Sequence, residues 1–179
     1  MTAGPSPDEL AGPVPDDLVG GSVEVATPDD MEELGATVAG LVRAGDVIVL
    51  AGDLGAGKTT FTRGLGEALG VRGPVTSPTF VLARTHPNLG DGPVLVHVDA
   101  YRLDSALELD DLDIDFPTSV VVVEWGEGLI EALTESYLAV RIDRPHGASA
   151  AVEPVAEGEE PVEPRTVTVT GVGPRWARR

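Results

Sequence analysis

The sequence predicts an α/β fold with a mostly parallel central sheet, flanking antiparallel strands and helices on both faces. Asp46–Ala51 contains the run VIVLA and Val120–Val123 reads VVVV; uninterrupted apolar runs are typical of strands buried on both faces of a parallel sheet. Helical patterns separate such segments along the chain, as in α/β proteins. Tyr137–Ile142 and Thr166–Thr170 instead alternate apolar and polar residues, which indicates an antiparallel pair.

Local signals predict the other elements. Thr27 and Pro28 fit the N-cap and first position of a helix. Ser105 and Glu108 have capping-box spacing at the start of a short helix. The remaining expected elements are strands at 22–26, 81–86 and 94–98 and helices at 58–69 and 128–133.

The 179 residues are expected to form one domain, over residues 22–171. Residues 1–21 are rich in Pro, Gly and Asp and have no apolar period, so we expect a disordered leader. Residues 145–164 are acidic and Pro-rich, which predicts a long inserted loop between two strands. Residues 172–179, which include Arg175, are expected to form a basic, solvated tail.

Composition excludes several classes of function. The formal net charge is −18, and a surface this acidic does not favour direct binding of nucleic acid, whose phosphates require clustered Lys and Arg. The chain contains no cysteine, which excludes disulfides and thiolate metal sites. No apolar run approaches the ~18 residues of a membrane span, and no signal peptide precedes the domain. We therefore expect a soluble, cytoplasmic protein with no membrane partner.

A glycine-rich loop follows the first buried strand. Gly52 to Thr59 reads GDLGAGKT and fits G-x-x-x-x-G-K-[ST], the Walker A or P-loop motif. Its glycines let successive backbone N–H groups point at phosphate oxygens, and the helix that follows adds its positive end. Lys58, the one lysine beside eleven arginines, is expected to reach the β- and γ-phosphates, and Thr59 to offer its hydroxyl to Mg²⁺. The predicted fold is therefore like that of P-loop NTPases.

Acidic residues end two of the predicted buried strands. Asp99 follows VLVHV and Glu124 follows VVVV, at the sheet edge that also carries the P-loop. At least one is expected to hold Mg²⁺ or its water, and the sequence leaves open how the two divide these roles. His97 shares the face of Asp99, and we expect it to be a packed histidine. The segment Thr76–Phe80 is either a γ-phosphate-sensing switch or an ordinary Ser-Pro turn.

The number and positions of the basic residues argue against two alternative functions. Without a second lysine the chain has no Asn-Lys-x-Asp loop, which excludes guanine specificity of the Ras type. No arginine cluster follows the P-loop, which argues against the lid of a small-molecule or nucleoside kinase. A kinase nevertheless stays the enzymatic alternative, and a nucleotide-dependent binding module the non-enzymatic one.

Four motifs in order, GDLGAGKTTFTRGLGEALG, SPTF, HVDAYRL and VVEWGEGL, resemble the TsaE (formerly YjeE) family, bacterial ATPases of tRNA threonylcarbamoyladenosine biosynthesis. The resemblance extends from about Val25 to Thr170. It implies a P-loop domain that binds ATP or ADP with Mg²⁺ and hydrolyses ATP. It also implies that the protein works together with the partners TsaB and TsaD and reaches tRNA only through them. The resemblance further implies that this chain does not itself transfer the threonylcarbamoyl group.

The resemblance also implies roles for individual residues. The nucleotide-binding set is Thr27, Gly52, Asp53, Leu54, Gly55, Ala56, Gly57, Lys58, Thr59, Thr60 and Trp125. The catalytic set is Asp99, Lys58 and Glu124, and the Mg²⁺ set is Thr59, Glu124 and Asp99. The insertion at 145–164 lies where the family carries a basic contact to the nucleotide, and Arg165 is the candidate substitute.

Overall fold

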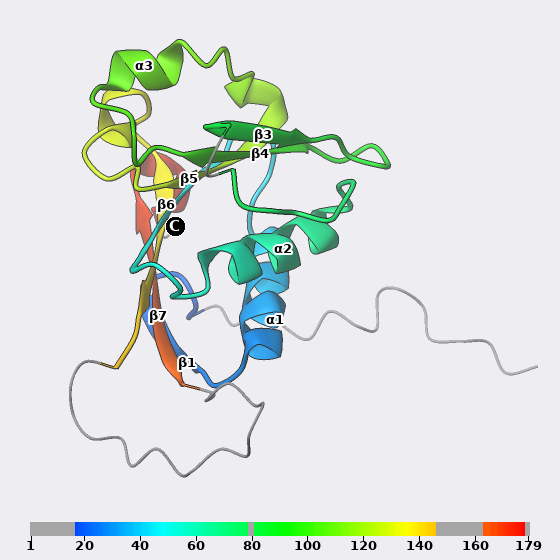
Figure 1. The fold of residues 1–179 in the computed structure, drawn as a ribbon, viewed down its shortest axis with the longest axis vertical. Helices are drawn as coiled ribbons and strands as arrows, with labels where there is room; N and C mark the ends of the chain where they lie inside the picture. Colours follow the sequence, from blue (N-terminus) through cyan, green and yellow to red (C-terminus); the bar gives the residue numbers. More distant parts are fainter. Residues whose placement is uncertain (1–16, 79–80, 146–162, 178–179) are drawn as a thin grey trace, which may run out of the picture.

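The computed structural model describes residues 17–78, 81–145 and 163–177 (Figure 1). Its strands form one seven-stranded sheet in the order β1-β7-β6-β2-β5-β4-β3. The strands are β1 (Gly21–Val25), β2 (Val47–Gly52), β3 (Ala83–His86), β4 (Val94–Asp99), β5 (Ser119–Glu124), β6 (Tyr137–Asp143) and β7 (Arg165–Val172). The β6-β2, β2-β5 and β5-β4 pairs are parallel. The β1-β7, β7-β6 and β4-β3 pairs are antiparallel, which confirms the predicted fold class.

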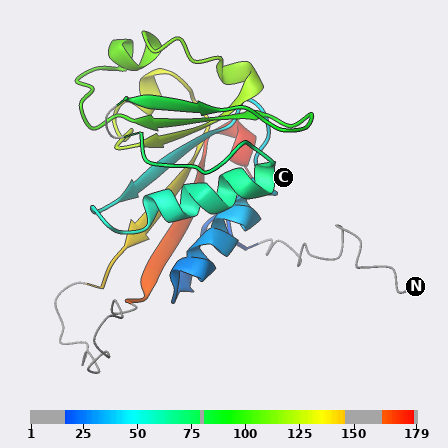
Figure 2. The same ribbon diagram turned by 45° about the vertical axis from the view of Figure 1, so that its right-hand side comes forward.

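Helices cover both faces of the sheet (Figures 1 and 2). They are α1 (Pro28–Ala39), α2 (Lys58–Leu69) and α3 (Ala106–Asp110), with single 3₁₀ turns at η2 (Phe116–Thr118), η3 (Ile130–Ala132) and η4 (Pro174–Trp176). One core lies between the sheet and α1 and α2. The other contains Leu109 of α3 and Ile130 of η3. The helix expected at 128–133 is therefore reduced to the 3₁₀ turn η3.

Helix α1 packs closely against α2, the helix that follows the loop after β2. The predicted N-cap of α1 is confirmed, because the hydroxyl of Thr27 accepts a hydrogen bond of 3.1 Å from the Asp30 N–H. The two helices approach through glycines: a Cβ added to Gly35 would lie 2.2 Å from the Phe61 carbonyl oxygen, and one added to Gly64 would lie 2.0 Å from that of Glu32. The α2 backbone therefore rests directly on α1.

Burial explains the sequence patterns of the strands. All six residues of β5 are buried, as are the first four of β2. In β6 burial alternates, with Leu138, Val140 and Ile142 inside and Arg141 outside. Strand β3 begins at Ala83, two residues later than expected. Leu82 has a left-handed φ of 63° and belongs to a turn, a conformation that apolar character alone does not signal.

Both ends of the described domain extend further than the sequence predicted. Leu18, assigned to the leader, is 8% exposed and packs in the core of α1 and α2. Arg175 was expected in a solvated tail, which is wrong: its Nε and Nη2 donate to the two Oδ atoms of buried Asp46 at 3.1 and 3.0 Å. The rest of the predicted leader (1–16), most of the insertion (146–162) and residues 178–179 lie outside the described residues.

Candidate functional site

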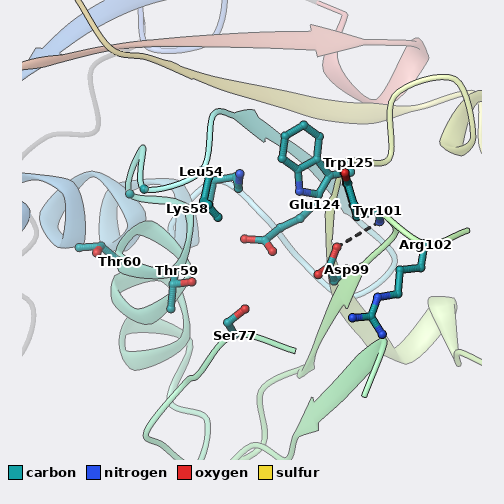
Figure 3. A pocket seen from close by; sticks show the side chains of 12 residues that line it. Leu54, Lys58, Thr59, Thr60, Ser77, Asp99, Tyr101, Arg102, Glu124 and Trp125 are labelled. Carbon is teal, nitrogen blue, oxygen red and sulfur yellow. Dashed lines mark hydrogen bonds between the residues drawn. The ribbon is translucent and has the colours of Figure 1, made fainter. Parts of the chain in front are cut away.

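A pocket of about 660 Å³ opens where β2, β4 and β5 end and α2 begins (Figure 3). Its size is typical of sites for small ligands. Twelve residues line it: Leu54, Gly55, Gly57, Lys58, Thr59, Thr60, Ser77, Asp99, Tyr101, Arg102, Glu124 and Trp125. The structure thus brings most of the predicted site residues together.

The loop between β2 and α2 has the backbone that the P-loop motif requires. Gly55 and Gly57 have φ angles of 77° and 113°, in the left-handed region that glycine adopts without steric cost. Gly57 is the N-cap of α2, so the unpaired N–H groups of the first helical turn open beside the pocket. Such a helix start attracts anions, phosphates above all.

Lys58 is the first residue of α2, directly after this loop, and is 8% exposed. Its Nζ donates to the carbonyl oxygens of Gly52 at 2.6 Å and Asp53 at 3.4 Å. The same ammonium lies 4.4 Å from the centroid of the Trp125 ring, within range of a cation–π interaction. The loop therefore stabilises its own cation at the place where the motif predicts phosphate.

Two aromatic rings form the rim of the pocket. Trp125 follows β5 with a left-handed φ of 60°, a backbone state that costs roughly 1–2 kcal/mol for a residue other than glycine. Tyr101 meets it edge-on, with centroids 5.5 Å apart and planes at 66°. Trp125 was predicted from the family motif. Tyr101 and Arg102 were missed, although both follow Asp99 closely in HVDAYRL.

The two predicted carboxylates stand side by side. Asp99 and Glu124 are partners in the register of β4 and β5. Asp99 Oδ1 accepts a hydrogen bond of 3.1 Å from the Tyr101 N–H. Glu124 is only 4% exposed, and Figure 3 shows its carboxylate pointing into the pocket. His97 lies beside these two carboxylates, with its Nε2 3.5 Å from Glu124 Oε1.

The chemistry of these donors fits Mg²⁺. Thr59, Asp99 and Glu124 all line the pocket and present oxygen atoms, the ligands that this hard cation takes. Among the described residues no group of three His, Cys, Asp or Glu side chains is placed to enclose a metal. Mg²⁺ is usually held by one or two carboxylates and completes its shell with phosphate oxygens and water, so an incomplete protein cage suits it.

The other predicted nucleotide-binding residues lie just outside the main pocket. Thr27 lines a second pocket of about 300 Å³, which shares Gly55, Gly57 and Thr60 with the first and also contains Arg165. The remaining three residues interact through their backbone carbonyls. Those of Gly52 and Asp53 accept hydrogen bonds from Lys58, and that of Ala56 accepts one from Arg165.

Arg165 connects β7 to the P-loop. Its Nε donates to the Ala56 carbonyl at 3.1 Å and its Nη2 to that of Gly55 at 3.4 Å. Its Nη1 donates to the carbonyl and carboxylate oxygens of Glu163. Arg144 donates to the same carboxylate at 2.7 Å, and this hydrogen bond is the main cause that lowers the pKa of Glu163. Arg165 thus reaches the P-loop, and whether it contacts a nucleotide stays a prediction.

The segment Thr76–Phe80 is described only in part. Ser77 lines the main pocket together with the P-loop residues (Figure 3). Residues 79 and 80 lie outside the described residues. The position of Ser77 suits a group that senses a bound phosphate, and the switch itself stays a prediction.

The sequence from residue 25 to residue 151 matches the family described as "Threonylcarbamoyl adenosine biosynthesis protein TsaE". That match covers most of the chain and includes the P-loop and both carboxylates. The chain belongs to the TsaE family.

Among the part of the chain that the structure describes, none of the helices has the length and apolar composition needed to cross a membrane.

Individual members of the TsaE family are similar to this chain over most of its length. The chain is 61% identical over 150 residues to the tRNA threonylcarbamoyladenosine biosynthesis protein TsaE of Streptomyces coelicolor, which covers 82% of this chain and 94% of that protein. It is 35% identical over 153 residues to TsaE of Bacillus subtilis, covering 83% and 84%. The crystal structure of Bacillus subtilis YdiB superposes with a TM-score of 0.61 at 32% identity, covering 85% of each chain.

Proposed function

We propose that this TsaE-family protein is an ATP hydrolase that binds ATP or ADP with Mg²⁺ and supports N6-threonylcarbamoyladenosine modification at position 37 of tRNA. The observation that carries the proposal is the meeting of Lys58, Thr59, Asp99 and Glu124 in one pocket beside the start of α2. A family role in tRNA threonylcarbamoyladenosine biosynthesis is common to the relatives.

The chain's own groups then divide the work. Lys58 leaves the carbonyls of Gly52 and Asp53 for the β- and γ-phosphates, while the N–H groups of the loop hold the remaining phosphate oxygens. Thr59 and Glu124 hold Mg²⁺, which supplies positive charge against the phosphate oxygens when bound. Asp99, held by the Tyr101 N–H, orients or activates the attacking water. The adenosine part of the nucleotide occupies the second pocket beside Thr27.

The partners follow from charge and family. A net charge of −18 opposes direct contact with tRNA, because like charges repel and phosphate contacts need basic clusters. We propose that the protein acts in the cytoplasm with TsaB-like and TsaD-like proteins, through which it reaches tRNA. It does not itself transfer the threonylcarbamoyl group, and its ATP cycle supports turnover by those partners.

Phosphate release tests the enzymatic proposal. Purified protein incubated with ATP and Mg²⁺ should release inorganic phosphate without an acceptor. Asp99→Asn and Glu124→Gln should each lower that rate roughly 100-fold or more, with affinity for ADP without metal changed only a few-fold. Asp110→Asn, at an exposed position of α3, is the matched control and should behave as wild type. Undiminished rates in both carboxylate variants would contradict the assignment.

Two alternatives predict other products. A small-molecule or nucleoside kinase would pass the phosphoryl group to an added metabolite and release little free phosphate. Arg102 is the one arginine among the residues that line the main pocket, which gives little support for a multi-arginine lid. A nucleotide-dependent binding module would show association with TsaB and TsaD homologues that follows ATP occupancy, and this association would be unchanged in Asp99→Asn.

A further inference from the structure

His97 is a buried polar residue that has no hydrogen-bond partner among the described residues. Its exposed fraction is 0%, which agrees with the packed histidine expected from sequence. Yet within the described residues neither Nδ1 nor Nε2 makes a hydrogen bond. Leaving a buried donor or acceptor unpaired costs free energy of folding. An imidazole at this position is therefore expected to have a function that an apolar side chain could not perform.

The sheet register aims this imidazole at the candidate site. His97 lies opposite Val122 in the β4-β5 pair, two residues before Asp99 and Glu124 on their strands. Because alternate residues of a strand share a face, His97 lies one step below the two carboxylates. Its Nε2 is 3.5 Å from Glu124 Oε1, and the two side chains are 0% and 5% exposed.

The other polar groups beneath the pocket are already engaged. Buried Thr62 donates to the Lys58 carbonyl at 2.8 Å, and Asp99 accepts from the Tyr101 N–H. Within the described part of the chain, no side-chain hydrogen bond fixes the Glu124 carboxylate, whereas His97 faces it. A shift of about half an ångström would bring Nε2 and Oε1 to an ordinary hydrogen-bond distance.

The geometry points to His97 as the positioning residue for Glu124. Its Nε2–H donates to Oε1 and turns the carboxylate so that the other oxygen, Oε2, faces the pocket and the metal. Carboxylates and imidazoles that bind metals are commonly held by such hydrogen bonds, and losing one costs about 10–100-fold in metal affinity. The inference rests on the proposed metal role of Glu124. It requires a proton on Nε2, and His97 itself touches neither metal nor nucleotide.

Two amide substitutions separate positioning from simple packing. In His97→Gln the side-chain amide nitrogen takes about the place of Nε2, so the donor to Glu124 is kept. In His97→Asn the amide nitrogen takes the place of Nδ1, which points elsewhere. His97→Phe fills the volume without any donor. A purely structural role would rank these variants by thermal stability and would affect nucleotide and metal binding alike.

The readout is metal affinity, measured without turnover. Mn²⁺ is titrated into the ADP-bound protein and followed by electron paramagnetic resonance. We expect wild type and His97→Gln to agree within about 3-fold and His97→Asn and His97→Phe to bind Mn²⁺ about 10–100-fold more weakly. ADP affinity without metal should stay within about 3-fold of wild type in every variant that retains a cooperative thermal transition. In a Glu124→Ala background His97→Asn should have no further effect, because coupled residues are not additive.

Each contrary outcome is decisive. Wild-type Mn²⁺ affinity in His97→Asn, or equal losses in His97→Asn and His97→Gln, would overturn the assignment of Nε2 as the donor. An effect of His97→Asn that persists in the Glu124→Ala background would overturn the link to Glu124. If the wild type binds Mn²⁺ with the expected variant pattern but releases no phosphate from ATP, the hydrolytic proposal fails and the positioning role stands. If wild type binds no Mn²⁺, both fail.

Discussion

The central strands (β2, β4 and β5) and the outer strands (β1, β6 and β7) of one sheet are built differently. Every residue of β5 is buried, so both faces of the central strands meet a core. Along β6 and β7 burial alternates, and one face of these strands contains exposed Arg141, Thr166 and Thr170. Asp99 and Glu124 end central strands, whereas Arg165 at the start of β7 supports the P-loop. The residues proposed to carry the chemistry thus lie on the central strands, and a residue that supports them lies on an outer one.

The largest effect expected on the central strands is loss of nucleotide binding in Lys58→Ala. Without the ammonium at the loop, affinity for ADP should fall at least ~100-fold, because one charged contact to phosphate contributes several kcal/mol in a shielded site. Isothermal titration calorimetry measures it. Arg63→Ala is the control on the same helix, since Arg63 pairs with Glu32 at the surface, and it should bind ADP as wild type does. Full ADP affinity in Lys58→Ala would contradict the P-loop role.

The junction between outer and central strands should yield the next effect. Arg175, after β7, pairs with both oxygens of Asp46, just before β2, and also donates to the Leu41 carbonyl at 3.1 Å. Arg175→Gln leaves a buried carboxylate uncompensated and should lower the free energy of unfolding by about 2–3 kcal/mol. Urea denaturation measures it. The exposed Arg63–Glu32 pair is the control, because Arg63→Gln should cost under ~0.5 kcal/mol; equal costs would remove the distinction.

Alanine substitutions at neighbouring positions test the two-sided burial itself. On β5, Val121→Ala and Val122→Ala should both destabilise by about 2 kcal/mol, since each removes two methyl groups from a filled core. On β7 the pair should split: Val169→Ala should cost about the same, while Thr170→Ala, on the exposed face, should stay within ~0.5 kcal/mol. Unfolding midpoints at constant m-value measure this. A small destabilisation in Val121→Ala would show that the second core contributes little to the free energy of unfolding.

Sequence alone predicted the central strands better than their surroundings. The VVVV run and the VIVLA run each identified a buried strand, because two-sided burial leaves no room for polar residues. The P-loop identified the pocket, since its glycines are required by backbone geometry and its Lys58 by the charge of the expected phosphate. The docking of Arg175 on Asp46 was not predictable, because a contact across 129 positions leaves no periodic signal. The Arg165 contact with the P-loop and the pairing of His97 with Glu124 depend on strand order in the same way.

The smallest effect concerns the antiparallel strand at the opposite edge, β3, where His86 is buried. Burial is the main cause that lowers the pKa of His86 from its ordinary 6.5, and a hydrogen bond with the Arg72 backbone offsets part of it. Because the unfolded chain takes up the proton more readily, its stabilisation is complete above pH 6.5 and is lost as the pH falls below that value. Urea unfolding between pH 7.5 and 5.5 should therefore show a steeper loss in wild type than in His86→Phe, which cannot titrate. Surface carboxylates contribute equally to both proteins over this range, so parallel pH profiles would show that His86 takes up its proton as easily in the folded protein as in the unfolded chain.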